Sequence, residues 1–179
     1  MNQARVVIRR AEVRDVSSVE IIARATWPVT YAGIIPDDIQ RRLLDSWYSP
    51  ESLRRTLATP GSSLFVAESN GDVVGFAQFV RRPPDAAELT RIYVLPDRQR
   101  DGIGMRLLDA GLTEFAGEGL KQLTVEVERD NRNGRRFYER AGFAETRELT
   151  RDVQEYVLPL VEYRRPILGS ASLISQPIT

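Results

Sequence analysis

The chain has 179 residues, of which 42% are hydrophobic and 28% charged, a composition typical of an ordinary folded domain with one sizeable core. Lysine plus arginine equals aspartate plus glutamate at 25 each, so no overall charge draws the protein to nucleic acid or to an anionic membrane. The absence of cysteine and histidine excludes disulfides, thiolate metal sites, the usual zinc ligand and the usual general base. We therefore expect no bound metal and a chemistry that uses carboxylate, tyrosine, lysine or ordered water.

We expect no targeting signal in the N-terminal residues. The apolar run at 6–8 passes directly into charged residues, which makes it too short for a signal peptide. No other run approaches the length of a membrane-spanning helix. We expect a cytoplasmic protein with no membrane partner.

The first third of the chain predicts one strand and three helices. Residues 6–10 form a strand-like run, and Asp15 is placed to cap a helix with an apolar face. We expect that helix to end at Pro28, because proline has no N–H and interrupts a helix. Pro36 lies at the first turn of a second helix, and Ser49 is the N-cap of a short third helix.

Strands follow in the middle of the chain. Residues 64–69 and 73–80 flank Asn70-Gly71, a two-residue hairpin signal because a type I′ turn needs positive φ at both positions. Residues 88–94 form the next strand. It leads directly into a turn that contains two glycines.

That turn is Gln99-Arg100-Asp101-Gly102-Ile103-Gly104, and it opens an amphipathic helix. The apolar residues of the helix recur at a 3.6-residue period, namely Ile103, Leu107, Leu108, Leu112 and Phe115. A helix that begins just after Gly102 directs its unpaired N–H groups and its positive dipole end at the turn. The two glycines allow close backbone approach to a bulky anion such as a pyrophosphate. The turn therefore predicts a phosphate site, although a simple strand-to-helix turn would show the same glycines.

A second motif lies beyond the helix. Residues 123–128 alternate apolar and polar side chains as a half-exposed strand does, which directs Glu126 and Glu128 to the same face. The strand runs into Asn131, which is followed by Phe137-Tyr138-Glu139-x-x-Gly142-Phe143. The pair of motifs, Gln99-x-x-Gly102-x-Gly104 and this one, resembles the GNAT superfamily of N-acetyltransferases. One departure is Gly134, where that family usually has alanine.

The resemblance implies an α/β fold, in which a mixed sheet is flanked by helices on both faces. Residues 146–149 and 160–165 supply the two final strands. We expect residues 1–166 to form one acetyltransferase domain. The tail, 167–179, is rich in serine and small residues, so we expect it to be poorly ordered or to lie against the partner subunit of a homodimer.

The resemblance also implies that acetyl-CoA is the cosubstrate, and it indicates which residues bind it. The turn would bind the pyrophosphate through backbone N–H groups, the strand ending at Val94 would pair with the pantetheine arm, and Arg135 would meet the adenosine 3′-phosphate. The predicted cofactor-binding residues are Ile92, Tyr93, Val94, Gln99, Arg100, Asp101, Gly102, Ile103, Gly104, Met105, Asn131, Arg135 and Tyr138.

For the chemistry, Tyr138 matches the family tyrosine that donates its proton to the departing thiolate. A phenol is protonated at neutral pH, as this role requires. Glu126 is the preferred candidate for the general base, Glu88 is the other candidate, and ordered water is the third. Trp27 and Tyr31 lie where the family builds its acceptor wall, although aromatic residues at such spacing are often only core.

The resulting prediction is an enzyme that transfers an acetyl group directly from acetyl-CoA to a primary amine. Polyamine, aminoglycoside, amino acid and protein N-terminus all stay open as acceptors. A CoA-binding sensor of the same fold without turnover is the main alternative. A nucleotide-binding strand-turn-helix domain is a third, but the chain lacks the acidic ribose contact expected of one.

Overall fold

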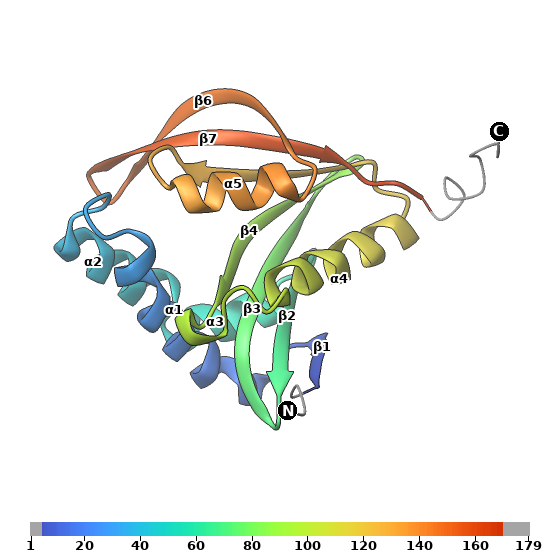
Figure 1. Cartoon of the computed structure of the whole chain (residues 1–179), viewed down its shortest axis with the longest axis horizontal. Coiled ribbons are helices and arrows are strands. Elements are labelled where there is room, and N and C mark those ends of the chain that lie inside the picture. The colour runs from blue at the N-terminus through green and yellow to red at the C-terminus, as the bar shows by residue number, and fades with distance from the viewer. Residues whose placement is uncertain (1–4, 170–179) are drawn as a thin grey trace.

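A computed structural model describes residues 5–169, which fold into a seven-stranded mixed sheet with the order β1-β2-β3-β4-β5-β7-β6 (Figure 1). Every neighbouring pair is antiparallel except β4 and β5, which run parallel. The strands are β1 (Val6–Arg10), β2 (Ser62–Ser69), β3 (Asp72–Arg82), β4 (Ala86–Val94), β5 (Gln122–Glu128), β6 (Ala144–Val153) and β7 (Tyr156–Pro166). The helices are α1 (Val16–Thr30), α2 (Asp37–Trp47), α3 (Pro50–Ala58), α4 (Ile103–Gly117) and α5 (Arg132–Arg140). Most of the predicted tail, from residue 170 on, lies outside the described residues.

Helices cover both faces of the sheet, as predicted. One face, here called the α1 face, packs against α1, α2 and α3 through a cluster that includes Val19, Ile22 and Phe76. The opposite face, here called the α4 face, packs against α4 and α5 through a cluster that includes Leu107, Leu108 and Phe115. Two apolar layers, one on each side of the sheet, thus form the core.

The first helix continues past Pro28, where we had expected it to end. α1 runs to Thr30, and the N–H of Tyr31 still donates to the carbonyl of Trp27 at 2.9 Å. Proline removes one helical donor, but Pro28 and Arg24 both lie on the exposed side of α1, where solvent can satisfy the carbonyl left free. The buried Trp27 holds the other side of this turn against the core.

Two hairpins show how much a turn signal depends on glycine. In the predicted hairpin, Asn70 and Gly71 have φ values of 55° and 90°. The final hairpin turns at Gln154 and Glu155, whose φ values of 50° and 66° are unusual for such side chains. That turn lacks glycine, and nearly every side chain of β6 is exposed, so β6 has little apolar pattern. The strands predicted from the sequence, 146–149 and 160–165, are therefore shorter than the observed β6 and β7.

The sheet opens between its two parallel strands. β4 pairs with β5 only over Ala86–Leu89 and Gln122–Val125, and the two strands separate beyond these residues. β4 has a β-bulge where it pairs with β3: Gln78 pairs with Arg91 and Phe79 with Leu89, so Thr90 of β4 is an extra residue with no partner on β3. The opening and the bulge occur at the same point, and together they create the space in which the candidate site lies.

Candidate active site

The glycine turn has the backbone of an anion site. Gly102 is the N-cap of α4 with φ 74°, and Arg100 has φ 73°, a conformation that a residue with a side chain seldom adopts. Left-handed residues in a turn direct successive N–H groups inward, and the helix dipole adds positive charge. Arg100, Gly102, Ile103, Gly104 and Met105 all line a cavity of about 760 Å³, here called the turn cavity. The exposed Asp101 instead faces Arg98, with 3.4 Å between its carboxylate and Nε.

Gly104 and α5 bring the two motifs into contact. A Cβ at Gly104 would lie 3.2 Å from the ring of Phe137, so glycine allows the first turn of α4 to pack closely against α5. Arg140, one turn further along α5, lines the turn cavity.

Arg135, our predicted phosphate contact, does not line the turn cavity. Its guanidinium donates to the hydroxyl of Tyr163 and to the carboxylate of Glu145, both at 2.9 Å. Arg135 therefore ties α5 to β7 and β6, and Arg140 is the arginine that α5 presents to the turn cavity.

The opening between β4 and β5 exposes backbone N–H groups of β4. The N–H of Leu95 donates to the carbonyl of Val74 on β3 at 2.9 Å. Successive N–H groups of a strand point to opposite sides, so those of Val94 and Ile92 point away from β3, toward the opening. The Gln99 side chain donates to the carbonyl of Val94 at 3.1 Å and closes the end of the strand. Ile92, Tyr93, Val94 and Gln99 all line a cavity of about 250 Å³ in this opening, here called the cleft.

Residues from the second motif form the other wall of the cleft. Asn131 is the N-cap of α5, where its Oδ1 accepts from the N–H of Gly134 at 3.0 Å. A Cβ at position 134 would lie 2.7 Å from Nδ2 of Asn131, so alanine at this position would require the Asn131 side chain to shift. Tyr138 lines the cleft and is 7% exposed, and burial raises the pKa of its phenol. The phenol therefore stays protonated throughout the neutral range.

A second cavity of about 290 Å³ lies on the α1 face and is rich in aromatic side chains; we call it the aromatic cavity. Trp27 and Tyr31 line it, as do Trp47, Tyr48 and Tyr93. The hydroxyls of Tyr31 and Tyr93 lie 3.0 Å apart, which joins α1 to β4 at the boundary with the cleft. The two residues predicted for the acceptor wall thus border one cavity.

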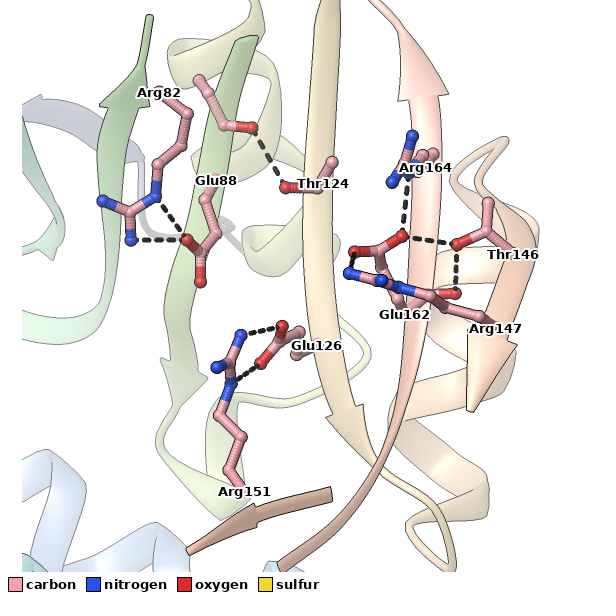
Figure 2. Close-up of polar contacts among 10 residues, drawn as sticks. Arg82, Glu88, Thr124, Glu126, Thr146, Arg147, Arg151, Glu162 and Arg164 are labelled. Carbon is pink, nitrogen blue, oxygen red and sulfur yellow. Dashed lines mark hydrogen bonds and ion pairs between the residues drawn. The ribbon is translucent and has the colours of Figure 1, made fainter. Parts of the chain in front are cut away.

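Both predicted bases also line the aromatic cavity, but each is bound to an arginine (Figure 2). Glu88 accepts from Nε of Arg82 at 2.8 Å. Glu126 accepts from Arg151 of β6 through both carboxylate oxygens, with a distance of 2.6 Å from Nε. These carboxylates are neutralised within the sheet.

Glu128, two residues further along β5, is a carboxylate in the cleft that the sequence motifs do not indicate as a base. It lies on the same side of β5 as Glu126, and both glutamates border the cleft and the aromatic cavity, but Glu128 is only 5% exposed. One carboxylate oxygen accepts from the N–H of Asp130 at 2.7 Å. Burial raises the pKa of the carboxyl. Strand alternation predicted this face, but burial, which distinguishes Glu128 from Glu126, depends on tertiary packing.

The three cavities connect in a line. The turn cavity and the cleft share Ile92, Val94 and Gln99, and the cleft and the aromatic cavity share Tyr31, Tyr93 and Glu128. The glycine turn therefore leads past the exposed strand N–H groups of β4 to an aromatic cavity that is bordered by a buried carboxylate. A mixed sheet that opens in this way beside a glycine turn is the architecture of acyltransferases that use acyl-CoA, which the two motifs predicted.

Comparison with known proteins also indicates an acyltransferase. The model of the Acetyltransferase (GNAT) family matches residues 28–143, more than half of the chain, so the chain belongs to this family of acetyltransferases. It is 28% identical over 140 residues to a spermidine N(1)-acetyltransferase of Thermoplasma acidophilum, covering 76% of this chain and 86% of that protein. It is 30% identical over 150 residues to a probable N-acetyltransferase of Mycobacterium tuberculosis, covering 80% of this chain and 82% of that protein.

A solved structure shows the same fold. The PaiA N-acetyltransferase of T. acidophilum in complex with coenzyme A superimposes with a TM-score of 0.75 at 25% identity, covering 88% of this chain and 98% of that one.

Within residues 5–169, no helix has the length and apolar character needed to cross a membrane.

Proposed function

We propose that the chain transfers the acetyl group of acetyl-CoA directly to a primary amine while both substrates are bound. The observation that carries this proposal is the line of three connected cavities, with Glu128 and Tyr138 bordering the middle one. The N–H groups of the glycine turn would bind the pyrophosphate, and Arg140 would add positive charge. The exposed N–H groups of Ile92 and Val94 would pair with the pantetheine arm and polarise the thioester carbonyl.

Glu128, rather than Glu126 or Glu88, is the general base in this proposal. A carboxylate whose pKa is raised by burial accepts a proton more readily than one neutralised by arginine. It would remove a proton from the amine as the amine nitrogen attacks the thioester carbon. The carbon–sulfur bond then breaks, and Tyr138 donates its O–H to the departing thiolate. The products are an amide and free coenzyme A.

The aromatic cavity would hold the acceptor, with Trp27 and Tyr31 as part of its wall. The name of the Thermoplasma relative, a spermidine N(1)-acetyltransferase, indicates that a primary amine is the acceptor in that protein. The order of the cavities supports the same assignment here, because the thioester would lie in the cleft, directly beside the aromatic cavity.

A thermal-shift titration with acetyl-CoA, coenzyme A, NAD and ATP tests the cosubstrate. We expect stabilisation by acetyl-CoA and coenzyme A, with no comparable response to NAD or ATP. Release of free thiol across a panel of primary amines then tests turnover. Stabilisation without thiol release from any amine would favour the sensor alternative, and no response to coenzyme A would reject the proposal.

A further inference from the structure

Arg91 lines both the cleft and the aromatic cavity, and it has no anionic partner among the residues that the structure describes. Its guanidinium carbon lies 4.5 Å from the centroid of the Tyr48 ring. Its Nη1 atom is buried and has no hydrogen-bond partner among residues 5–169, and none of the ion pairs in this part of the chain involves Arg91. Buried donors are nearly always satisfied in folded proteins, so this arginine at a cavity wall indicates a partner that the chain does not supply.

The bulge in β4 accounts for the position of this guanidinium. Without an extra residue, strand alternation would place Arg91 and Glu88 on opposite faces, because they are three positions apart. Thr90 has no partner in the register, so the alternation shifts by one, and both side chains border the aromatic cavity on the α1 face. The irregularity that opens the sheet therefore also brings a cation into the cavity.

The other charges around the aromatic cavity are paired, apart from one carboxylate. Arg82 neutralises Glu88 and Arg151 neutralises Glu126 (Figure 2). Glu128 bonds to a backbone N–H, and no ion pair joins it to Arg91 in the described part of the chain. The cavity thus presents one uncompensated anion, Glu128, and one uncompensated cation, Arg91.

We propose that the acceptor is an aminocarboxylate, whose amine lies against Glu128 and whose carboxylate is bound by Arg91. This inference rests on the proposed function, because it names the class of amine that enters the aromatic cavity. When a guanidinium stacks on an aromatic ring, its N–H donors stay in the guanidinium plane and are not used by the ring. Two of these donors can bind the two oxygens of a carboxylate side by side. A polyamine would instead place further positive charge beside Arg91, so this chain differs in acceptor from what the name of its Thermoplasma relative indicates for that protein.

Tryptophan fluorescence can test acceptor binding without requiring turnover. The chain contains two tryptophans, Trp27 and Trp47, and both line the aromatic cavity. We would titrate the protein, saturated with coenzyme A, with matched pairs that differ only in the carboxylate: L-leucine and isoamylamine, L-phenylalanine and 2-phenylethylamine, and 4-aminobutyrate and propylamine. Spermidine would serve as the cationic comparison.

We expect the member with the carboxylate to bind at least about tenfold more tightly in one or more pairs. Arg91→Met, which keeps the unbranched stem of the side chain without the guanidinium, should abolish that difference and leave affinity for the plain amine within about twofold. Arg91→Lys should keep part of the preference, because lysine retains the charge but not the planar donors. Arg55→Met, at an exposed site on α3, is the matched control and should keep the whole preference.

Equal affinity for both members of every pair would overturn the proposal, as would an equal loss for both in Arg91→Met. Tighter binding of spermidine than of any aminocarboxylate would also overturn it. Failure of the proposed function is separate, because it would appear as absence of thiol release even where these binding differences are found.

Discussion

Arg151 on β6 binds both carboxylate oxygens of Glu126 on β5 and thereby neutralises the glutamate that the sequence motif favours as a base (Figure 2). Glu128, on the same face of the same strand, has no arginine partner in the described residues and is buried beside the cleft. The two glutamates lie two residues apart on the same face of β5, but Glu126 is paired with an arginine and Glu128 is buried without one in the described residues. That difference leads to a direct comparison by mutation.

We predict that Glu128→Gln lowers kcat by about 100-fold or more, because the amide cannot accept the proton of the amine. The acidic limb of the pH–rate profile should disappear with the carboxylate. In the wild type that limb should lie above the ordinary glutamate range, because burial raises the pKa of Glu128. Steady-state thiol release as a function of pH measures both effects.

Glu126→Gln is the matched control for that experiment. Its amide keeps the shape of the side chain but weakens the bond to Arg151, so we expect a loss of less than about tenfold. A larger loss in Glu126→Gln than in Glu128→Gln would return the role of base to Glu126.

Glu128 should also make stability depend on pH. Its pKa is raised in the folded protein, so the folded state binds more protons than the unfolded state, and stability falls as pH rises from the ordinary glutamate pKa to the raised one. Glu128→Gln should therefore melt at a higher temperature than wild type at neutral pH. The gain should vanish below about pH 4, where the carboxyl is protonated in both states. Melting curves across this range would contradict the prediction if the gain stayed constant.

Tyr138→Phe should lower kcat by about 100-fold while the Kd for acetyl-CoA changes by less than about threefold, because only the proton donor is removed. Tyr163→Phe is the control, since Tyr163 lies in the same apolar cluster and its hydroxyl bonds to Arg135 outside the cavities. It should lower the melting temperature with little change in kcat. Calorimetry and thiol release together distinguish the two, and an equal loss of binding and turnover in Tyr138→Phe would make Tyr138 a packing residue.

Gly102→Val should weaken acetyl-CoA binding by at least about tenfold in calorimetry. A β-branched residue resists the positive φ of 74°, so the turn would rearrange and its N–H groups would move. Gly119→Val carries the same backbone penalty, at φ 76° in a turn remote from the cavities, and neither glycine has an atom within 4 Å of an added Cβ. Equal binding by the two variants would show that the turn does not hold the cosubstrate.

Two glycines of α4 should respond to alanine in opposite directions. A Cβ at Gly111 would lie 2.4 Å from the ring of the buried Phe79, so Gly111→Ala should destabilise the protein by about 1–3 kcal/mol through overpacking. Gly117 has open space around it, so Gly117→Ala should stabilise the helix by about 0.5–1 kcal/mol. Chemical denaturation measures both values, and a stable Gly111→Ala would mean that α4 can move away from β3.

The amino-acid sequence determined the features that depend on near neighbours in the chain. Helix periodicity, the Ser49 cap with its 3.2 Å bond from Ser52, and the Asn70-Gly71 hairpin were all predicted and are present. The two motifs predicted the family and the mixed sheet with helices on both faces. They could do so because turns with particular backbone conformations require glycine and other turn residues at fixed spacings in the sequence.

Tertiary structure decided what depends on residues distant in the chain. Only the pairing of β7 with both β5 and β6 brings Arg151 of β6 to Glu126 of β5. Contacts with Tyr163 of β7 and Glu145 of β6 hold Arg135 away from the turn cavity. The bulge that turns Arg91 to the α1 face is a property of the β3–β4 register, which no periodicity in β4 alone reveals. Charge pairing and burial are set by contacts across the sheet, so the motifs in the sequence predicted the family, and the fold decided which carboxylate and which arginine lack a charged partner within residues 5–169.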